Sequence, residues 1–332
     1  MTEIYLTIFF ISLLLFLLGS GIWVALSMIA VSAIGMLLFT TRPVGDAMAT
    51  TIWGTSSSWT LTALPLFVWM GEILFRTKLS ENLFKGLSPW LSKLPGGLVH
   101  VNVVGCALFA AISGSSAATV ATVGKMSIPE LRKRKYPEKL LLGSLAGSGT
   151  LGLLIPPSII LIIYGVTIED SIAKLFMAGI LPGIMLAVMF MLYVIFWSIL
   201  NKKLMPKSTK NFSFVEKVQG SKQLLPVIFL ITAVIGSIYT GIATATEAAS
   251  LGVVGALILS FFQGTLSKET FNLSLLGATK TSCMIAFIIA GSTFLSLAMG
   301  FTGLPRNLAI WIDGMNLSPY TLLFVLTIFY II

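Results

Sequence analysis

Small and hydroxyl-bearing residues interrupt long apolar stretches at two places, and their types allow coordination of a hard cation. The first is Ser113-Gly114-Ser115-Ser116, and the second is Gly147-Ser148-Gly149-Thr150, followed by Pro156-Pro157. Backbone that leaves helical geometry at membrane depth must line a cavity or bind a ligand. Freed carbonyls and hydroxyls there would supply the oxygen ligands that suit Na⁺. The alternative is that the small residues only let helices pack closely, which is their commoner use in membranes.

The surrounding sequence argues against a nucleotide-binding site or a catalytic serine in these segments. The run from Gly147 to Gly152 fits G-x-G-x-x-G, yet it follows no predicted strand and lies within an apolar segment, so it is no dinucleotide site. Gly124-Lys125-Met126 lacks the Ser or Thr that follows the lysine of a P-loop. A serine nucleophile at 113–116 would need a base, and the single histidine, His100, is expected near the cytoplasmic mouth of its segment. The sequence does not predict an enzyme.

The composition indicates that lipid is the solvent for most of the chain. Of its 332 residues, 56% are hydrophobic and only 10% are charged, with a mean hydropathy of +0.99, whereas soluble domains are about 25% charged. Apolar runs continue from Ile4 to the last residue, so the first is predicted to be a membrane span and not a cleaved signal peptide. Cys106 and Cys283 lie in apolar segments, which argues against a disulfide framework or a zinc or haem site. The predicted class is a multi-pass, all-α membrane protein.

The net charge of +9 is concentrated in three loops. Sixteen of the 21 Lys and Arg residues fall there: Arg76, Lys78, Lys85, Lys93, Lys125, Arg132, Lys133, Arg134, Lys135, Lys139, Lys202, Lys203, Lys207, Lys210, Lys217 and Lys222. Because positive charge marks cytoplasmic loops in membrane proteins, these loops are predicted to face the cytoplasm. A nucleic-acid groove is not predicted.

The charge pattern also predicts a re-entrant hairpin at 98–128. If this apolar region crossed the membrane once, the basic loops on its two sides would lie on opposite faces, against the positive-inside rule. A hairpin returns to its own side, and the small, polar stretch at 113–119 would form its tip near the midplane. A broken helix at 140–165 is predicted to follow it, with the N-terminus of the chain on the periplasmic side.

Counting about 20 residues per crossing gives an inverted-topology repeat. The spans are predicted at roughly 4–18, 22–40, 61–76, 140–165, 175–200, 224–240, 248–263 and 281–300. Residues 1–200 form the first predicted repeat, 201–223 a basic cytoplasmic linker, and 224–332 an incomplete second repeat.

Two carboxylates lie in or beside spans. Glu72 is expected to pair with Arg76 four residues on, and Glu247 is expected to be stabilised by a helix N-terminus.

Several motifs, in order along the chain, resemble the large membrane subunit of tripartite ATP-independent periplasmic (TRAP) transporters. They are Leu64-Pro65-Leu66-Phe67-Val68-Trp69-Met70-Gly71-Glu72-Ile73-Leu74, the stretch from Ser113 to Gly124, Gly147-Ser148-Gly149-Thr150 through Ile155-Pro156-Pro157-Ser158, Ala178-Gly179-Ile180-Leu181-Pro182-Gly183 and Thr244-Ala245-Thr246-Glu247-Ala248-Ala249. The resemblance implies a scaffold with an elevator-type moving transport domain. It also implies a Na⁺-coupled secondary transporter that imports organic acid anions, such as C4-dicarboxylates or sialic acid, without ATP or a cofactor other than the coupling ion.

By the same resemblance, the partners are a small four-helix membrane subunit and a periplasmic substrate-binding protein. The hairpin tip, Ser113 to Ser116, is expected to bind substrate, and Na⁺ is expected to bind at a set shared between tip and broken helix: Ser115, Ser116, Gly147, Ser148, Gly149, Thr150 and Pro156. Family members continue past the equivalent of Ile332 into a second hairpin, so a C-terminally truncated permease is expected. The alternative function is a non-transporting remnant or a channel-like membrane component.

Overall fold

The computed structural model describes residues 2–77, 79–206, 212–222 and 224–331, which form α-helices and short 3₁₀ helices without a strand. The predicted all-α fold is confirmed. The α-helices are α1 Thr2–Gly19, α2 Val24–Phe39, α3 Val44–Ser56, α4 Ala63–Phe75, α5 Leu79–Leu91, α6 His100–Ser113, α7 Ser116–Lys133, α8 Glu138–Gly149, α9 Ile159–Thr167, α10 Ile172–Leu200, α11 Phe214–Ser221, α12 Leu225–Tyr239, α13 Ala245–Phe262, α14 Lys268–Phe301, α15 Leu304–Asp313 and α16 Pro319–Ile331. The 3₁₀ helices are η1 Trp59–Thr62, η2 Gly97–Val99, η3 Thr150–Leu153 and η4 Lys202–Leu204.

Several of these helices have the length and apolar character that a membrane crossing needs. Among the described residues, α10, α13 and α14 are each long and apolar enough to span a bilayer, and up to five spans result if two bent helix pairs are each taken as one. Helix α10 exposes large apolar side chains along its length, including Leu181, Met185, Leu192 and Phe196. An apolar surface of this kind is stable against lipid and not against water. The chain is therefore a helical membrane protein.

The chain forms two compact units. The smaller unit contains residues 2–57 and 284–331, and the larger unit contains residues 58–283. In the smaller unit, Phe10 of α1, Val31 of α2 and Leu304 of α15 pack together. Each unit combines segments from both predicted repeats, so the boundary between the two units does not coincide with the linker at 201–223. The inverted repeat stays a prediction.

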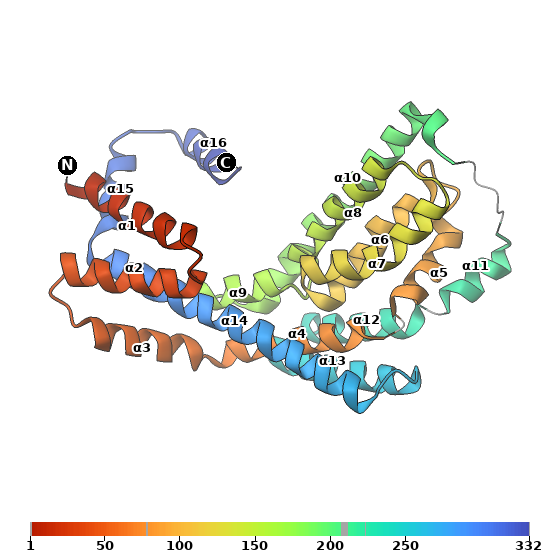
Figure 1. The fold of residues 1–332 in the computed structure, drawn as a ribbon, viewed down its shortest axis with the longest axis horizontal. Helices are drawn as coiled ribbons and strands as arrows, with labels where there is room; N and C mark the ends of the chain where they lie inside the picture. The colour runs from red at the N-terminus through yellow and green to blue at the C-terminus, as the bar shows by residue number, and fades with distance from the viewer. Residues whose placement is uncertain (1, 78, 207–211, 223, 332) are drawn as a thin grey trace. The chain divides into compact units, whose positions relative to one another are not determined.

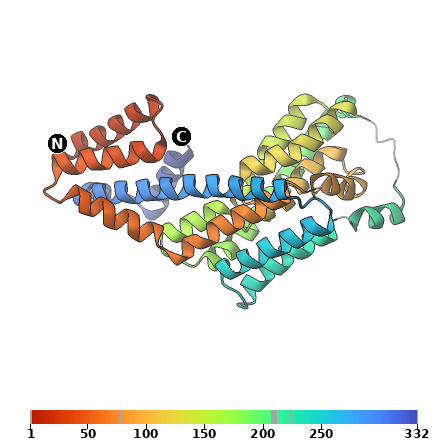
Figure 2. The ribbon, with the colours of Figure 1, turned by 60° about the horizontal axis from the view of Figure 1, so that its bottom comes forward.

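The larger unit is built around α6, which lies beside α7, α8 and α10 (Figure 1). Its core includes Val103 and Ala110 of α6 and Leu151 of η3, with side chains of α10 packed on them. Helices α12 and α13 run side by side, and α13 packs closely on α4 (Figure 2). Gly252 of α13 permits this approach, because a Cβ there would lie 2.5 Å from Sδ of Met70. The elements that carry the candidate site, α4 and α6 to α9, thus all belong to this unit.

Several segments that were expected to be loops contain helices, among them α11 in the 201–223 linker. The outer loop around Asp46 forms α3, with Asp46 in its first turn, and residues between the third span and the hairpin form the amphipathic helix α5. The expected outer loop at 301–319 contains α15. The second arm of the hairpin continues to Lys133 instead of ending at 128, and α14 begins at Lys268 instead of at 281. Of the basic residues assigned to cytoplasmic loops, Lys78, Lys207 and Lys210 lie outside the described residues.

Candidate functional site

The turn between α6 and α7 is a short, hydrogen-bonded tip. Helix α6 ends at Ser113, and Gly114 follows with φ +58° in the left-handed region, which favours glycine. Ser115 is extended and caps α7, its Oγ accepting a hydrogen bond from the Ala118 N–H at 3.4 Å. Oγ1 of Thr119 donates to the Ser115 carbonyl at 2.7 Å and lies 3.1 Å from Oγ of Ser113. These bonds fix the conformation of the tip.

The helix break lies farther along the chain than its sequence indicated. Gly147 and Ser148 lie in the last turn of α8, and both of their carbonyls accept a hydrogen bond from the Thr150 N–H. The carbonyls of Gly147 and Ser148 are therefore not free, contrary to the prediction for these two residues. Regular helix stops after η3 and resumes at Ile159, because neither Pro156 nor Pro157 has an N–H with which to continue it.

The hairpin tip packs directly against this break. The carbonyl oxygen of Gly114 accepts a hydrogen bond from the Ile159 N–H at 3.3 Å. A Cβ on Gly114 would lie 2.7 Å from the carbonyl oxygen of Pro157, and a Cβ on Gly152 would lie 3.0 Å from the backbone nitrogen of Ser116. The two glycines thus allow backbone to approach backbone. The larger unit therefore brings the tip, 113–116, together with the second half of the broken segment.

Helix α4 closes the same place from another side. A Cβ on Gly71 would lie 2.9 Å from Cα and 3.3 Å from the carbonyl oxygen of Ser113. Gly71 is helical, so its role is the close approach of α4 to the tip and not an unusual backbone angle. Sequence reasoning missed Gly71, Gly152 and Pro157 as contacts of the tip. All three stand within the motifs that carry the family resemblance, but those motifs do not show which residues contact one another.

The expected cation ligands differ in their surroundings. Oγ of Ser116 is buried and, within the described part of the chain, has no hydrogen-bond partner, whereas Oγ of Ser148 donates to the Ser144 carbonyl at 2.5 Å. Thr150 is exposed, and its Oγ1 donates to the Gly147 carbonyl at 2.7 Å. Pro156 is buried within the break, and Gly149 faces Val120 of α7. Ser116 is thus the one hydroxyl of this set left unsatisfied beside the tip.

No acidic side chain takes part in this arrangement. Among the residues that the structure describes, no three His, Cys, Asp or Glu side chains are grouped so that they could hold a metal ion. The oxygen atoms that take part in the contacts of the tip belong to serine and threonine hydroxyls and to backbone carbonyls.

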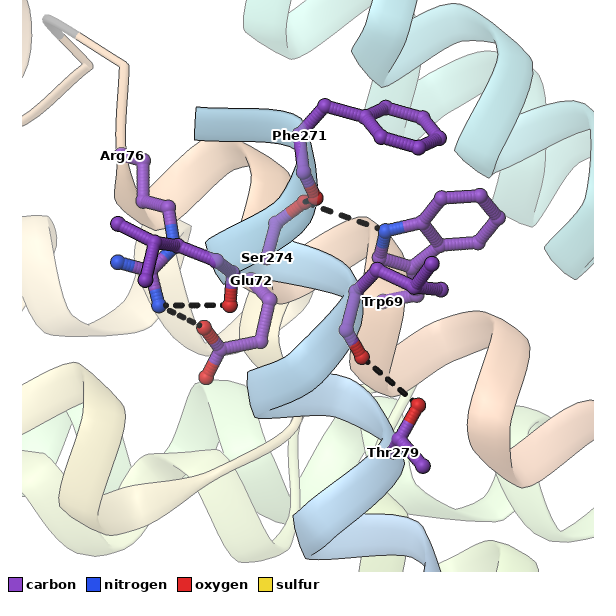
Figure 3. A network of polar contacts seen from close by, with 8 residues as sticks. Trp69, Glu72, Arg76, Phe271, Ser274 and Thr279 are labelled. Carbon is purple, nitrogen blue, oxygen red and sulfur yellow. Dashed lines mark hydrogen bonds and ion pairs between the residues drawn. The ribbon is translucent and has the colours of Figure 1, made fainter. Parts of the chain in front are cut away.

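Glu72 and Arg76 belong to a separate polar network that joins α4 to the first part of α14 (Figure 3). Their predicted ion pair is confirmed at 2.9 Å, and Arg76 also donates to the Leu273 carbonyl at 3.2 Å. Nε1 of Trp69 donates to Oγ of Ser274 at 3.3 Å. The predicted role of Glu247 is confirmed as well: its carboxylate accepts a hydrogen bond from the Thr244 N–H at 2.8 Å in a capping box at the start of α13.

Gly277→Ala is expected to weaken the contact between α4 and α14. A Cβ at 277 would lie 2.7 Å from Oε2 of Glu72, so the carboxylate must move and its bond to Arg76 must lengthen. Glu72 is partly exposed and its side chain is flexible, so we expect a loss of no more than about 1 kcal/mol in the free energy of unfolding. Thermal unfolding of the purified protein measures this loss of stability. Gly300→Ala, with open space around its Cβ, is the control, and an equal shift in both variants would contradict the assignment.

Comparison with known proteins shows the family to which this chain belongs. The family model described as "Tripartite ATP-independent periplasmic transporter, DctM component" matches residues 10–332. The C4-dicarboxylate TRAP transporter large permease protein DctM of Pseudomonas aeruginosa is 33% identical over 297 residues, which cover 89% of this chain and 69% of that protein. The sialic acid TRAP transporter large permease protein SiaM of Vibrio cholerae is 31% identical over 317 residues, covering 94% and 72%. The chain therefore belongs to the DctM family of TRAP transporter large permeases.

Proposed function

We propose that this permease couples the entry of Na⁺ to the import of an organic acid anion, such as a C4-dicarboxylate, sialic acid or a similar carboxylate. Relatives named for C4-dicarboxylates and for sialic acid support the substrate class. The anion would bind at the hairpin tip, where Ser113, Ser115 and Ser116 supply hydroxyl groups. Na⁺ would bind beside it, between the tip and the break in the α8–α9 segment.

One observation carries the cation site. The buried hydroxyl of Ser116 has no partner among the described residues, and the backbone of Ser115 and Ser116 lies against Gly152 of η3. A buried hydroxyl without a hydrogen bond costs about 1–3 kcal/mol, and a bound cation would remove that cost by accepting the oxygen lone pair. Na⁺ held there would also hold the tip against the break, so that occupancy by the ion shapes the substrate site.

The proposal includes the partners and the orientation of the chain. A periplasmic substrate-binding protein would deliver the anion, and a small four-helix membrane subunit would lie beside the permease in the bacterial inner membrane. The N-terminus would be periplasmic, so that the basic loops face the cytoplasm.

The orientation predicts which positions react with a membrane-impermeant thiol reagent. In a Cys283→Ser background, where the remaining Cys106 is buried, Lys93→Cys and Lys133→Cys are expected to react only from the cytoplasmic side. Glu169→Cys is expected to react only from the periplasmic side. All three side chains are exposed in the structure. Labelling of positions 93 and 133 from opposite faces would show that 98–128 crosses the membrane and that the hairpin is wrong.

Reconstitution tests the function. The permease, the small subunit and the binding protein are placed in lipid vesicles, and uptake of labelled organic acids is measured with an inward gradient of Na⁺ or of K⁺. We expect uptake that requires the binding protein and Na⁺ together. Uptake indifferent to both would instead support a channel-like component, and no uptake of any tested acid under the Na⁺ gradient would support a non-transporting protein.

Ser116→Ala is expected to raise the Na⁺ concentration for half-maximal uptake about fivefold, as the loss of one ligand worth about 1 kcal/mol requires. The effect is limited because backbone carbonyls remain. Thr150→Ala is the matched control, since that hydroxyl is exposed and already donates to the Gly147 carbonyl at the end of α8. If both variants keep the wild-type Na⁺ dependence at normal membrane levels, Ser116 only packs helices.

A further inference from the structure

A groove of about 880 Å³ lies in the larger unit, away from the hairpin tip. One wall is the segment between α5 and η2, which includes Lys93 and Gly96, and the other is the end of α10 with η4, which includes Ser198 and Lys202. Tyr136, from the turn between α7 and α8, completes it. Each of these segments borders a loop that is rich in lysine and arginine.

The groove carries positive charge without compensation. Lys93 and Lys202 are its charged lining residues, and no carboxylate lines it. Both lysines are exposed, and in the part of the chain that the structure describes neither forms an ion pair with a carboxylate. Two ammonium groups on opposite walls favour an anion between them.

Two hydroxyl groups in the groove are available to such an anion. Ser198 is 3% exposed, and its Oγ has no partner among the described residues. The hydroxyl oxygen of Tyr136 accepts a hydrogen bond from the Leu98 N–H at 3.1 Å, which leaves its proton free to donate. Burial raises the pKa of Tyr136, so the hydroxyl keeps that proton at neutral pH. A phosphate group offers several acceptor oxygens to these donors.

Gly96 keeps this wall of the groove in place. Its φ of +103° is in the region that favours glycine, and a Cβ there would lie 3.1 Å from Oγ of Ser198 and 2.6 Å from Cγ1 of Val194. His100 lies behind it, fully buried, with its Nε2 2.8 Å from the Pro95 carbonyl oxygen. The backbone of the segment is thus fixed against α10 before any ligand binds.

The rest of the groove is apolar and continues onto a lipid-facing surface. Ile199 and Met205 line it, and Ile199 stands on the same side of α10 as the exposed Leu192 and Phe196, which precede it by about two turns and one turn. A ligand with a phosphate and an acyl chain would satisfy both parts, whereas a free phosphate would leave the apolar part against water. We propose that this groove binds the phosphate headgroup of an anionic phospholipid, with Lys93, Lys202 and Ser198 as its contacts.

In the orientation given under the proposed function, the groove would take its lipid from the cytoplasmic leaflet. The choice of leaflet rests on that orientation, but the binding of the lipid does not. The thiol labelling above tests the orientation independently. A wrong orientation would move the groove to the other leaflet and leave its affinity for lipid unchanged. The two proposals therefore fail in distinguishable ways.

Native mass spectrometry of the purified full chain in detergent tests the binding. The protein is titrated with phosphatidylglycerol or with phosphatidylcholine. We expect one phosphatidylglycerol to bind preferentially, with the double variant Lys93→Gln/Lys202→Gln losing affinity about fivefold per lysine and Ser198→Ala about threefold. Lys133→Gln/Lys139→Gln, which removes the same charge outside the groove, should bind like the wild type.

Each other outcome overturns the proposal. Equal affinity for the two lipids would show that the groove does not recognise an anionic headgroup. Equal losses in the two double variants would show general surface electrostatics. Displacement of phosphatidylglycerol by excess inorganic phosphate would show that free phosphate, and not lipid, is the ligand. The melting temperatures of all variants are measured alongside, to detect a variant that fails to fold. Ser198→Ala tests the groove without a change in charge.

Discussion

Gly114→Ala is expected to abolish uptake and to cost about 3 kcal/mol in the free energy of unfolding. The left-handed backbone at φ +58° costs an alanine about 1 kcal/mol or more. The added Cβ would lie 2.7 Å from the Pro157 carbonyl oxygen and 3.1 Å from the Ile159 nitrogen, so backbone must move, at about 1–3 kcal/mol. The movement separates the hairpin tip from the break. Uptake in lipid vesicles and thermal unfolding of the purified variant measure the two effects.

Gly143→Ala is the matched control for this variant. Gly143 is an exposed helical residue of α8, and a Cβ there would meet nothing within 4 Å. Alanine is also the better helix former, so this variant should be neutral or slightly stabilised. A Gly114→Ala protein that transports and unfolds like Gly143→Ala would show that the tip does not depend on its contact with Pro157.

Gly71→Ala is expected to cost about 2 kcal/mol in the free energy of unfolding and to reduce uptake strongly. Its Cβ would press on Cα of Ser113 at 2.9 Å, and no side-chain rotation can relieve a contact with backbone. Either α4 moves outward or the tip moves toward the break, and both change the geometry around Ser113.

Gly236→Ala on α12 is the comparison, because the same substitution there has open space around it. The apparent melting temperature and the rate of uptake of the two variants are measured together. If Gly71→Ala lowers stability while uptake by the folded fraction is unchanged, α4 supports the unit without shaping the site.

The hairpin was predictable because its signal is the charge of the flanking loops and not its own hydropathy. Basic residues on both sides of 98–128 required a return to the same face, and the structure has two adjacent helices there, α6 and α7, joined at Gly114. Whether the pair enters the membrane without crossing it is the question that thiol labelling answers. The second arm of the hairpin, α7, continues to Lys133, because Pro129 lies within the helix and does not end it.

The break was placed too early because glycine was given too much weight. Gly147 and Gly149 stay helical in α8, where packing on neighbouring helices outweighs the modest intrinsic cost of glycine. The two prolines, which lack the N–H that helix continuation needs, are the stronger signal. No pattern in the sequence could show that Gly152 and Pro157 face the tip, since that contact joins segments about 40 residues apart.

Two of the missed helices, α5 and α15, share one cause. Hydropathy detects segments that are apolar on every side, and α5 and α15 are apolar on one face only. Helix α5 has a partner in the larger unit: Trp90 donates from Nε1 to Oγ of Ser221 on α11 at 2.8 Å, and Lys217 lies over the Trp90 ring. A search for amphipathic periodicity between the spans would have found both helices.

Binding of Na⁺ to the permease itself tests the central claim most directly. A ligand that binds only the folded protein raises its stability as its concentration increases. Thermal unfolding is therefore measured over a series of Na⁺ concentrations at constant ionic strength, with K⁺ as the replacement ion. We predict a melting temperature that rises with Na⁺, a rise displaced to higher concentration in Ser116→Ala, and no displacement in Thr150→Ala. Identical melting temperatures in Na⁺ and K⁺ for the wild-type protein would contradict a sodium site between the hairpin tip and the broken helix.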